Sequence, residues 1–226
     1  MNKTGTKKII VFGASDAAEL AHYYFTHDSN YSVEAFAVDA AYLAERSRFC
    51  GLDVVAFEEV EKVFPPEQYA FFIALGYSHL NEARKAKYFA AKALGYELVS
   101  YVSSKATVLN DFAIGDNCFI LEDNTVQPFV TIGNNVTLWS GNHIGHHSRI
   151  DDHCFLASHI VVSGRVHVGS SCFIGVNATL RDNISVGEKS IIGAGALILS
   201  DVAANGVYVG NTTERSRVPS NRVRKI

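Results

Sequence analysis

Hydrophobic residues recur at every sixth position through the second half of the chain. Each sixth residue from Val102 to Ile198 is Ile, Leu or Val, without exception. These positions are Val102, Val108, Ile114, Ile120, Val126, Ile132, Leu138, Ile144, Ile150, Leu156, Val162, Val168, Ile174, Leu180, Val186, Ile192 and Ile198. A period of six matches neither a helix nor the simple alternation of a strand, so it indicates a solenoid of short repeats.

Each hexapeptide is typical of one short strand followed by a corner. The aliphatic residue and the residue two places before it would point inward, because side chains alternate along a strand. Small residues such as Cys154 and Ala178 often occupy that earlier position, and Gly often follows the aliphatic residue, where a corner needs backbone freedom. Three strands would complete a triangular turn of about eighteen residues, which stacks residues i and i+18. The pattern predicts a left-handed parallel β-helix of about five turns over residues 102–200, with an ordinary β-sandwich as the alternative.

The first hundred residues follow a different pattern, in which apolar strands alternate with helical segments. We expect strands at 8–12, 33–38, 52–56, 69–75 and 97–102, and helices at 16–27, 58–63 and 80–94. Continuous apolar strands in this order favour a small Rossmann-like parallel α/β domain. We therefore divide the chain into an α/β domain at 1–101 and a β-helix domain with a C-terminal tail at 102–226. No Gly/Ser-rich linker separates the halves, so we expect them to pack together.

Small and polar residues follow the predicted strands of the α/β domain. In parallel sheets of this type, ligands bind at the carboxyl ends of the strands. Those ends carry Gly13-Ala14-Ser15, Asp39 and Gly76, which become candidate substrate contacts. A glycine there lets backbone amides approach a phosphate at a helix N-terminus, although Asp16 would repel one. A purely structural glycine turn is the alternative.

Histidines are concentrated in the repeats, and one of them is a candidate general base. His146 comes just after Gly145 at a predicted outward corner, and the position eighteen residues later is Gly164. We expect a gap beside the His146 side chain, with a backbone N–H available. A base next to such donors is what acyl transfer from a thioester requires. For His147 a site role and a surface role remain open, whereas we interpret His153, His159 and His167 as solvated corner residues.

Other features refine the picture only slightly. Asn124 and Asn142 are eighteen residues apart at inward positions and predict a stacked amide ladder. Trp139 and Phe129 are candidates to face a neighbouring chain. Cys118, Cys154 and Cys172 occupy small inward positions without CxxC spacing, so we interpret them as buried thiols of a reducing compartment.

Charge and hydropathy exclude several classes of function. The 226 residues carry a net charge of −3, which does not favour nucleic-acid binding. No apolar run reaches the roughly 20 residues of a membrane span, and the N-terminus lacks the apolar core of a signal peptide. We expect a cytoplasmic protein. The basic tail of Arg215, Arg217, Arg222, Arg224 and Lys225 is either a solvated end or a contact for a phosphate.

The motifs together resemble a known family. The segments KIIVFGAS, NHIGHHSRI, CFIGVNATL, IIGAGALI and VYVGN are similar to those of the PglD/NeuD-like hexapeptide-repeat sugar acyltransferases, over nearly the whole chain. That group includes nucleotide-linked amino-sugar N-acetyltransferases and sialic-acid O-acetyltransferases. The resemblance implies a homotrimer with active sites between neighbouring β-helices, acetyl-CoA along the C-terminal coils and a nucleotide sugar on the α/β domain.

The resemblance also assigns individual residues. The family's catalytic base falls on His146, and His147 replaces the acidic residue that often follows it, so Asp123, Asp151 and Asp152 become candidates to orient the base. The acetyl-CoA contacts fall on Phe155, Gly164, Val176 and Ala194, with Phe155 replacing a histidine common in the family. Two further departures are GASDAA at 13–18, where GASGHG is usual, and Gly210-Asn211-Thr212-Thr213, where Gly-x-Pro-Ala is usual.

These observations predict an acetyl-CoA-dependent N-acetyltransferase that acts on a nucleotide-linked amino sugar, with His146 as the base and no metal. The first alternative is O-acetylation of a sugar hydroxyl. The second is a metalloenzyme of the γ-carbonic anhydrase kind, which needs three histidine ligands, two of them about five residues apart on one chain, and no two histidines of the repeats are five residues apart. A non-catalytic scaffold is the third.

Overall fold

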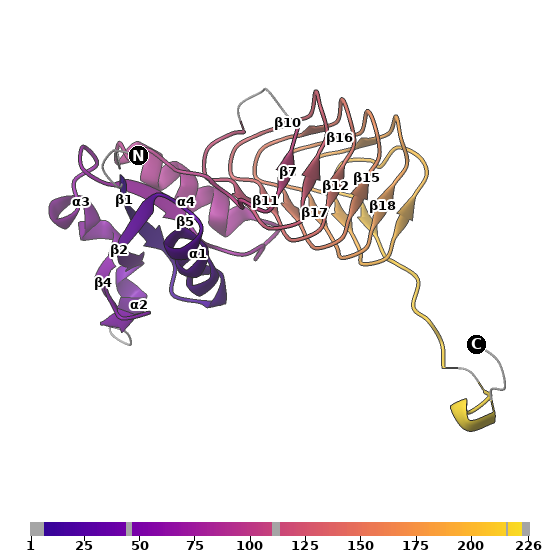
Figure 1. The fold of residues 1–226 in the computed structure, drawn as a ribbon, viewed down its shortest axis with the longest axis horizontal. Helices are drawn as coiled ribbons and strands as arrows, with labels where there is room; N and C mark the ends of the chain where they lie inside the picture. Colours follow the sequence, from indigo (N-terminus) through magenta and orange to yellow (C-terminus); the bar gives the residue numbers. More distant parts are fainter. Residues whose placement is uncertain (1–6, 44–46, 110–113, 216, 223–226) are drawn as a thin grey trace.

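The computed structural model describes residues 7–43, 47–109, 114–215 and 217–222, and these form two packed parts (Figure 1). A five-stranded sheet with its helices lies at one end of a long stack of coils, and the C-terminal tail leaves the stack at the opposite end. The predicted α/β part and the predicted parallel β-helix are therefore both confirmed.

The α/β part has one mixed sheet in the order β3-β4-β2-β1-β5. Its strands are β1 (Lys7–Phe12), β2 (Tyr31–Val38), β3 (Arg48–Phe49), β4 (Leu52–Ala56) and β5 (Ala70–Ile73). Its helices are α1 (Asp16–His27), α2 (Ala40–Leu43), the 3₁₀ turn η1 (Phe57–Glu59), α3 (Val60–Val63) and α4 (Glu82–Ala93). All pairings are parallel except β3 with β4, a short hairpin that the apolar pattern did not predict.

Both faces of this sheet are buried, which explains why its strands are continuously apolar. Ile9 and Val11 of β1 point to the face covered by α1 and its Phe25. Ile10 and Phe12 point to the opposite face, which is covered by Tyr88 of α4. The predicted last strand at 97–102 is divided: Leu98 makes one bridge to Phe71, whereas Tyr101 and Val102 begin the coils.

The coils consist of two-residue strands in three parallel sheets. The seven-stranded sheet contains β6 (Tyr101–Val102), β8 (Phe119–Ile120), β11 (Thr137–Leu138), β14 (Phe155–Leu156), β17 (Phe173–Ile174), β20 (Ile191–Ile192) and β22 (Val207–Tyr208). The six-stranded sheet contains β7 (Thr107–Val108), β9 (Thr125–Val126), β12 (His143–Ile144), β15 (Val161–Val162), β18 (Thr179–Leu180) and β21 (Leu197–Ile198). The four-stranded sheet contains β10 (Thr131–Ile132), β13 (Arg149–Ile150), β16 (His167–Val168) and β19 (Ser185–Val186), and a 3₁₀ turn, η2 (Ser220–Arg222), lies in the tail.

Stacking follows the predicted eighteen-residue register. Leu138 pairs with Leu156 and Leu156 with Ile174, and all three are fully buried in the interior of the coils. Val102 lies in the terminal strand β6 and remains 36 % exposed, since no further coil covers its free side. The stack extends beyond residue 200, because β22 pairs with β20.

Helix α4 fastens the α/β part to the coils through a buried guanidinium. Arg84 is 1 % exposed and donates from Nη1 to Thr137 Oγ1 at 2.6 Å. Its Nη2 donates to the main-chain oxygens of His153 (3.2 Å) and Cys154 (3.1 Å) and to Asn81 Oδ1 (2.9 Å). Asn81 in turn donates to the Cys172 oxygen at 3.2 Å. Four groups from three successive coils are therefore tied to the first turns of one helix.

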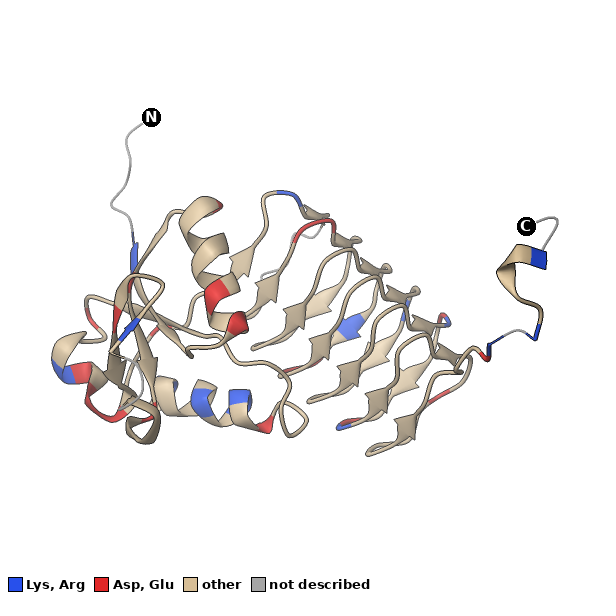
Figure 2. Cartoon of the chain, turned by 90° about the horizontal axis from the view of Figure 1, so that it is seen from below, with Lys and Arg blue, Asp and Glu red and all other residues tan. Residues whose placement is uncertain are grey.

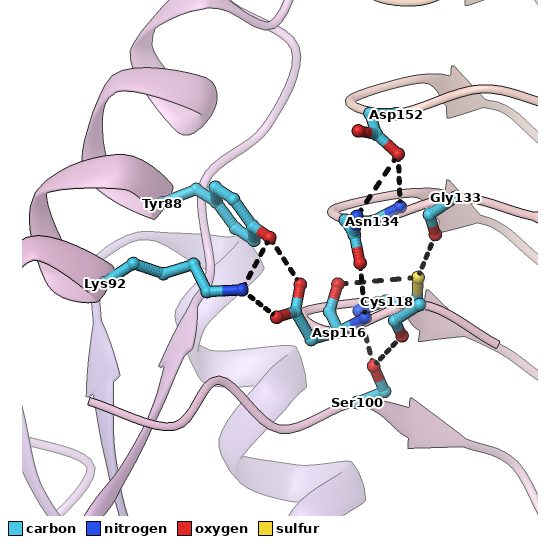
Figure 3. A network of polar contacts seen from close by, with 9 residues as sticks. Tyr88, Lys92, Ser100, Asp116, Cys118, Gly133, Asn134 and Asp152 are labelled. Carbon is cyan, nitrogen blue, oxygen red and sulfur yellow. Dashed lines mark hydrogen bonds and ion pairs between the residues drawn. The ribbon is translucent and has the colours of Figure 1, made fainter. Parts of the chain in front are cut away.

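The other end of α4 contacts a column of polar corner residues (Figure 3). Tyr88 donates to Asp116 Oδ1 at 2.6 Å, and Lys92 pairs with the same carboxylate. The Asp116 N–H donates to Asn134 Oδ1 at 3.0 Å, and the Asn134 N–H donates to Asp152 Oδ1 at 2.7 Å. The three sheets of the coils form the sides of a triangular prism, and helix α4 lies along one edge of it.

A ladder of buried side chains continues from the α/β sheet into the coils. The Ile73 N–H donates to Asn117 Oδ1 (2.7 Å), Asn117 donates to Asn135 Oδ1 (2.8 Å), and Asn135 donates to His153 Nδ1 (2.9 Å). His153 is only 4 % exposed, so its interpretation as a solvated corner residue was wrong. The sequence did not identify this column, because its members occupy corner positions that normally face water.

The other buried polar predictions can be compared directly. Asn124 and Asn142 are buried, but their amides bond to the main chain, including Trp139 O and Ile160 N–H, and the amide-to-amide ladder lies at Asn117 and Asn135 instead. The thiols of Cys118, Cys154 and Cys172 are buried as predicted, and each donates to a glycine oxygen of the next coil.

We predict that His153 makes the protein sensitive to acid. Burial, with further contributions from Lys85 and Arg84 against an opposing one from Asp152, lowers the pKa of His153 to about 4. Since the unfolded histidine has a pKa near 6.5, the unfolded state binds this proton more tightly. The free energy of unfolding should be unaffected above about pH 6.5 and should fall by about 3 kcal/mol as the pH is lowered to 4.

Denaturant unfolding of wild type and His153→Asn between pH 7 and 4 checks this. Asn tolerates the positive φ of 65° at this corner, can still accept from Asn135 and does not titrate. The variant should lose most of the pH dependence, and an unchanged slope would contradict the assignment.

Candidate active site

The predicted substrate residues of the α/β part surround a cavity of about 540 Å³ at the carboxyl ends of β1 and β2, the first cavity. It is lined by Phe12, Gly13, Ala14, Ser15, Val38, Asp39, Tyr42, Leu75, Ala83, Ala86 and Lys87. The structure thus brings together Gly13, Ala14, Ser15 and Asp39, four of the five predicted contacts. Lys87 also lines this cavity, and sequence reasoning missed it because it lies on α4, far along the chain.

Gly13 and Asp39 are both fixed by local structure. Gly13 has φ +125°, and a Cβ there would lie 2.8 Å from the Ala74 oxygen, so only glycine allows β1 to approach β5 this closely. Asp39 forms an ion pair with Lys87, whose ammonium lies 4.8 Å from the centre of the Phe57 ring. The cavity therefore contains the Asp39–Lys87 ion pair, and the ammonium of this pair packs against an aromatic ring.

A second cavity, of about 210 Å³, lies between the α/β sheet and the coils. It is lined by Asp16, Ala17, Leu20, Phe72, Ile73, Ala74, Leu75, Gly76, Tyr77, Asn117, Phe119, Thr137, Trp139 and Phe155. Gly76, the fifth predicted substrate contact, is here rather than in the first cavity. Leu75 lines both cavities, so the two are adjacent.

A third cavity, of about 400 Å³, opens along the seven-stranded sheet and the corner that follows it. It is lined by Tyr77, Trp139, Phe155, Ala157, Ser158, Phe173, Gly175, Val176 and Ala194. Three predicted acetyl-CoA positions, Phe155, Val176 and Ala194, therefore lie together. Trp139 lines the second and third cavities.

His146 and His147 lie at the corner between β12 and β13, where both are exposed. Their Nδ1 atoms are 3.1 Å apart, and the His146 N–H donates to Gln127 Oε1 at 2.9 Å. His147 has φ +60° and packs against the Phe129 ring, with the ring centres 4.7 Å apart. The Phe129 side chain is 58 % exposed.

Electrostatics favour a neutral partner for His146. Desolvation, followed by the positive charge of Arg165 and the neighbouring His146, lowers the pKa of His147. A neutral His147 can accept a hydrogen bond from the Nδ1–H of His146, which leaves Nε2 of His146 unprotonated, as a base requires. His147 can thus perform the orienting role for which a carboxylate would otherwise be needed.

The candidate acidic partners of His146 lie elsewhere. Asp151 pairs with Arg149 and His167, and Asp152 accepts from Asn134. Neither contacts His146 in the described structure. The backbone N–H of Asp123 is bonded to Lys105 O, at a different corner of the prism.

Gly164 provides the space for the His146 ring. A Cβ at Gly164 would lie 2.7 Å from Cε1 and 2.8 Å from Nε2 of His146. The expected gap exists, but the imidazole itself covers it. Gly164 is therefore next to the candidate base and apart from the other three predicted acetyl-CoA positions.

The candidate base and the third cavity lie at different edges of the prism. His146 follows β12 in the six-stranded sheet, whereas Val176 and Ala194 follow β17 and β20 in the seven-stranded sheet. One chain does not bring its own His146 to its own third cavity.

Three further predictions concern metal ions, membrane spans and the basic tail. No group of three His, Cys, Asp or Glu side chains in the described ranges is arranged to hold a metal ion. Among the helices that the structure describes, none is long and apolar enough to cross a membrane. Arg215, Arg217 and Arg222 are exposed at the far end of the coils (Figure 2), and Arg224 and Lys225 lie outside the described residues.

Comparison with known proteins supports this reading of the coils. The family described as bacterial transferase hexapeptide (six repeats) matches residues 113–146 and 165–200. No curated protein sequence matches the chain significantly.

Solved structures match almost the entire chain. Perosamine N-acetyltransferase from Caulobacter crescentus, in complex with CoA and GDP-perosamine, is 19% identical, with a TM-score of 0.80 over 90% of this chain and 93% of that one. The acetyltransferase domain of PglB from Neisseria gonorrhoeae is 23% identical, with a TM-score of 0.76 over 87% and 93%. WeeI from Acinetobacter baumannii is 20% identical, with a TM-score of 0.77 over 91% and 97%. Residues 113–146 and 165–200 are therefore similar to bacterial transferase hexapeptide repeats, and the chain has the same two-part, left-handed β-helix fold as these solved structures, in agreement with the resemblance seen in its sequence.

Proposed function

We propose that the protein transfers an acetyl group from acetyl-CoA to the amino group of a nucleotide-linked amino sugar, with His146 as the general base. The observation that supports this most directly is the bonded imidazole pair of His146 and His147 above Gly164. It occurs on the fold of a perosamine N-acetyltransferase whose structure holds CoA and GDP-perosamine.

The geometry suits proton removal from an attacking amine. Attack on the thioester places negative charge on the carbonyl oxygen and positive charge on the nitrogen. His147 holds the proton on Nδ1 of His146, so Nε2 is free to take the proton that the nitrogen loses. The acetyl group then remains on nitrogen, and the CoA sulfur takes the proton from Nε2 of His146 and leaves as the thiol.

The acceptor and donor are assigned to separate cavities. The first cavity, with Ser15, Asp39 and Lys87, suits the nucleotide part of the acceptor. The third cavity, with Phe155, Val176 and Ala194, suits the pantetheine arm of acetyl-CoA. The proposed reaction uses no metal ion.

We further propose a homotrimer, because the reaction needs His146 and the third cavity together. Since one chain holds them at different edges of its prism, a neighbouring chain must supply one of them. Cyclic packing of three prisms repeats the same contact three times and closes the assembly.

The activity test measures thiol release from acetyl-CoA with a panel of nucleotide-linked amino sugars that includes GDP-perosamine. His146→Ala should lower kcat by about 10²–10⁴, the usual contribution of a general base, and should remove the acidic limb of the pH profile of kcat/KM. His147→Ala should cost less, since it orients the base rather than touching the amine. The Michaelis constant for acetyl-CoA should hardly change in either variant.

The corresponding hydroxyl sugars serve as controls. Transfer to these and not to the amino sugars would replace the proposal with O-acetylation. Near-normal turnover in His146→Ala would show that the base is a different residue.

Asp16 gives a prediction about the nucleotide. It follows Ser15 of the first cavity in the first turn of α1 and itself lines the second cavity, so a diphosphate that joins ligand parts in the two cavities would pass it. Asp16→Asn should lower KM for the nucleotide sugar several-fold, because a repulsive charge is removed. It should also reduce stability by about 0.3–1 kcal/mol, because a carboxylate favours a helix N-terminus.

Glu19→Gln is the matched control for Asp16. Glu19 is the other acidic residue in the first turn of α1 and lines none of the cavities described. It should show the loss of stability without the change in KM. If both variants changed KM equally, the effect would be a general one of net charge.

Mixed assemblies test whether sites are shared. His146→Ala removes the base, and Val176→Trp fills the third cavity, so each variant alone should have strongly reduced activity. Co-expressed and co-purified, the two should regain a substantial fraction of the activity, because some interfaces join an intact base to an open cavity. Absence of recovery in verified mixed assemblies would place both parts in one chain.

A further inference from the structure

Four aromatic side chains meet where the second and third cavities join. Tyr77, from the loop between β5 and α4, lies with its ring centre 4.9 Å from that of Phe155 and 4.7 Å from that of Phe173. Phe155 and Phe173 stack with their ring centres 5.9 Å apart, and the ring centre of Trp139 lies 6.3 Å from that of Phe155. Tyr77 is 54 % exposed and Trp139 is partly exposed, so both present ring surface to a ligand.

One hydroxyl in the second cavity has a fixed direction. Thr137 Oγ1 accepts from Arg84, and a guanidinium can only donate, so the Thr137 proton points away from Arg84. No acceptor within the described chain takes that proton. Thr137 lines the second cavity, whose walls are otherwise largely apolar, so its proton is available to a ligand there.

Arg84 makes that hydroxyl a stronger donor. The guanidinium is buried, its Nε has no hydrogen-bond partner, and no carboxylate pairs with it in the described structure. Burial lowers the pKa of Arg84 to about 10, which still leaves it charged at neutral pH. A cation that donates to a hydroxyl in a dry environment polarises the O–H bond, and the hydroxyl then donates more strongly to the next acceptor.

The position of the second cavity indicates what it holds. It touches the first cavity at Leu75 and the third at Tyr77, Trp139 and Phe155. In the proposed reaction, the sugar is covalently joined to the nucleotide, and its amine must reach the thioester. The sugar ring must therefore lie between the first and third cavities. The volume of 210 Å³ equals that of about seven water molecules, which is the scale of a single sugar ring.

We propose that Tyr77, Trp139, Phe155 and the Thr137 hydroxyl form the subsite for the sugar ring of the acceptor. The C–H face of the ring packs on the aromatic side chains, and one oxygen substituent accepts the Thr137 proton. This subsite rests on the proposed function, and it makes Thr137 and Trp139 residues that select the acceptor.

The pantetheine arm suits this subsite less well. Its amides need several polar partners, and unpaired amides in an apolar cavity are costly. The Asn117 amide is already used by Ile73 and Asn135, which leaves Thr137 and the carboxylate of Asp16. The more open third cavity fits the arm better.

Trp139 is the only tryptophan of the chain, so its fluorescence reports on the subsite directly. Three ligands are titrated: the panel member with the highest kcat/KM, the same nucleoside diphosphate without its sugar, and CoA. The sugar-bearing ligand should change the emission of Trp139, and the bare diphosphate should bind with little change. If the bare diphosphate gives the same change, or if CoA alone changes the emission and the acceptor does not, the assignment of the sugar ring is wrong.

Kinetics with paired variants test the two contacts separately. Thr137→Val should raise KM for the acceptor by about 3- to 10-fold, the value of one hydrogen bond, and Thr137→Ser should restore it. Trp139→Leu should raise the same KM by a similar factor, and Trp139→Phe by less, because an aromatic face is kept. KM for acetyl-CoA should not change in the Thr137 variants. Because Trp139 also lines the third cavity, its variants should raise KM for the acceptor by a larger factor than KM for acetyl-CoA. Thermal unfolding of each variant shows whether the fold is intact, and Val63→Ala is the control for an exposed apolar residue outside the cavities.

The outcomes separate this subsite from the proposed function. If the wild type acetylates no nucleotide-linked amino sugar, the proposed function fails and the subsite fails with it. If the wild type is active and Thr137→Val and Trp139→Leu leave KM for the acceptor unchanged, only the subsite is wrong.

Discussion

The parallel hydrogen-bond ladder between residues about eighteen positions apart determines the rest of this structure. Each strand of a coil bonds to the next coil, as in the 2.8 Å bond from Gly145 N–H to Val162 O. Side chains that are far apart in sequence are thereby forced into straight columns. The column of Phe129, His147 and Arg165 places a ring on one side of His147 and a cation on the other. The ladder thus sets the surroundings of His147, the partner of the candidate base, as well as the fold.

The same regularity makes the prism edge a docking surface for a helix. Corner residues repeat at a constant spacing, so a straight helix such as α4 can contact several coils at once. Arg84 uses this by bonding to Thr137, His153 and Cys154. Burying a cation without a carboxylate partner costs free energy. Here oxygens of neutral groups from several coils accept hydrogen bonds from the guanidinium and offset part of that cost. The docking also creates the second cavity, because its walls come from both parts.

Much of this arrangement could be predicted from the sequence. The period of six predicted the coils, and the small inward residues predicted the buried thiols of Cys118, Cys154 and Cys172. His146, Gly164 and the loop at Gly13 were found because a corner, a gap and a strand end have recognisable patterns. The burial of His153 and the role of Lys87 could not be found this way, because each depends on where α4 lies.

The sequence alone determined what lies within a coil and between stacked coils, since those relations follow from a local period and a fixed register. It determined that His146 faces outward and that the interior is aliphatic. Only the tertiary structure decided the pairing of His146 with His147, because two neighbouring rings meet only at the positive φ of that corner. Only the tertiary structure brought Tyr77, Trp139 and Phe155 together, because no local pattern connects a loop of the α/β part with the face of a coil. The contacts between the two parts depend on shape and on a buried charge, and neither has a period that a sequence can show.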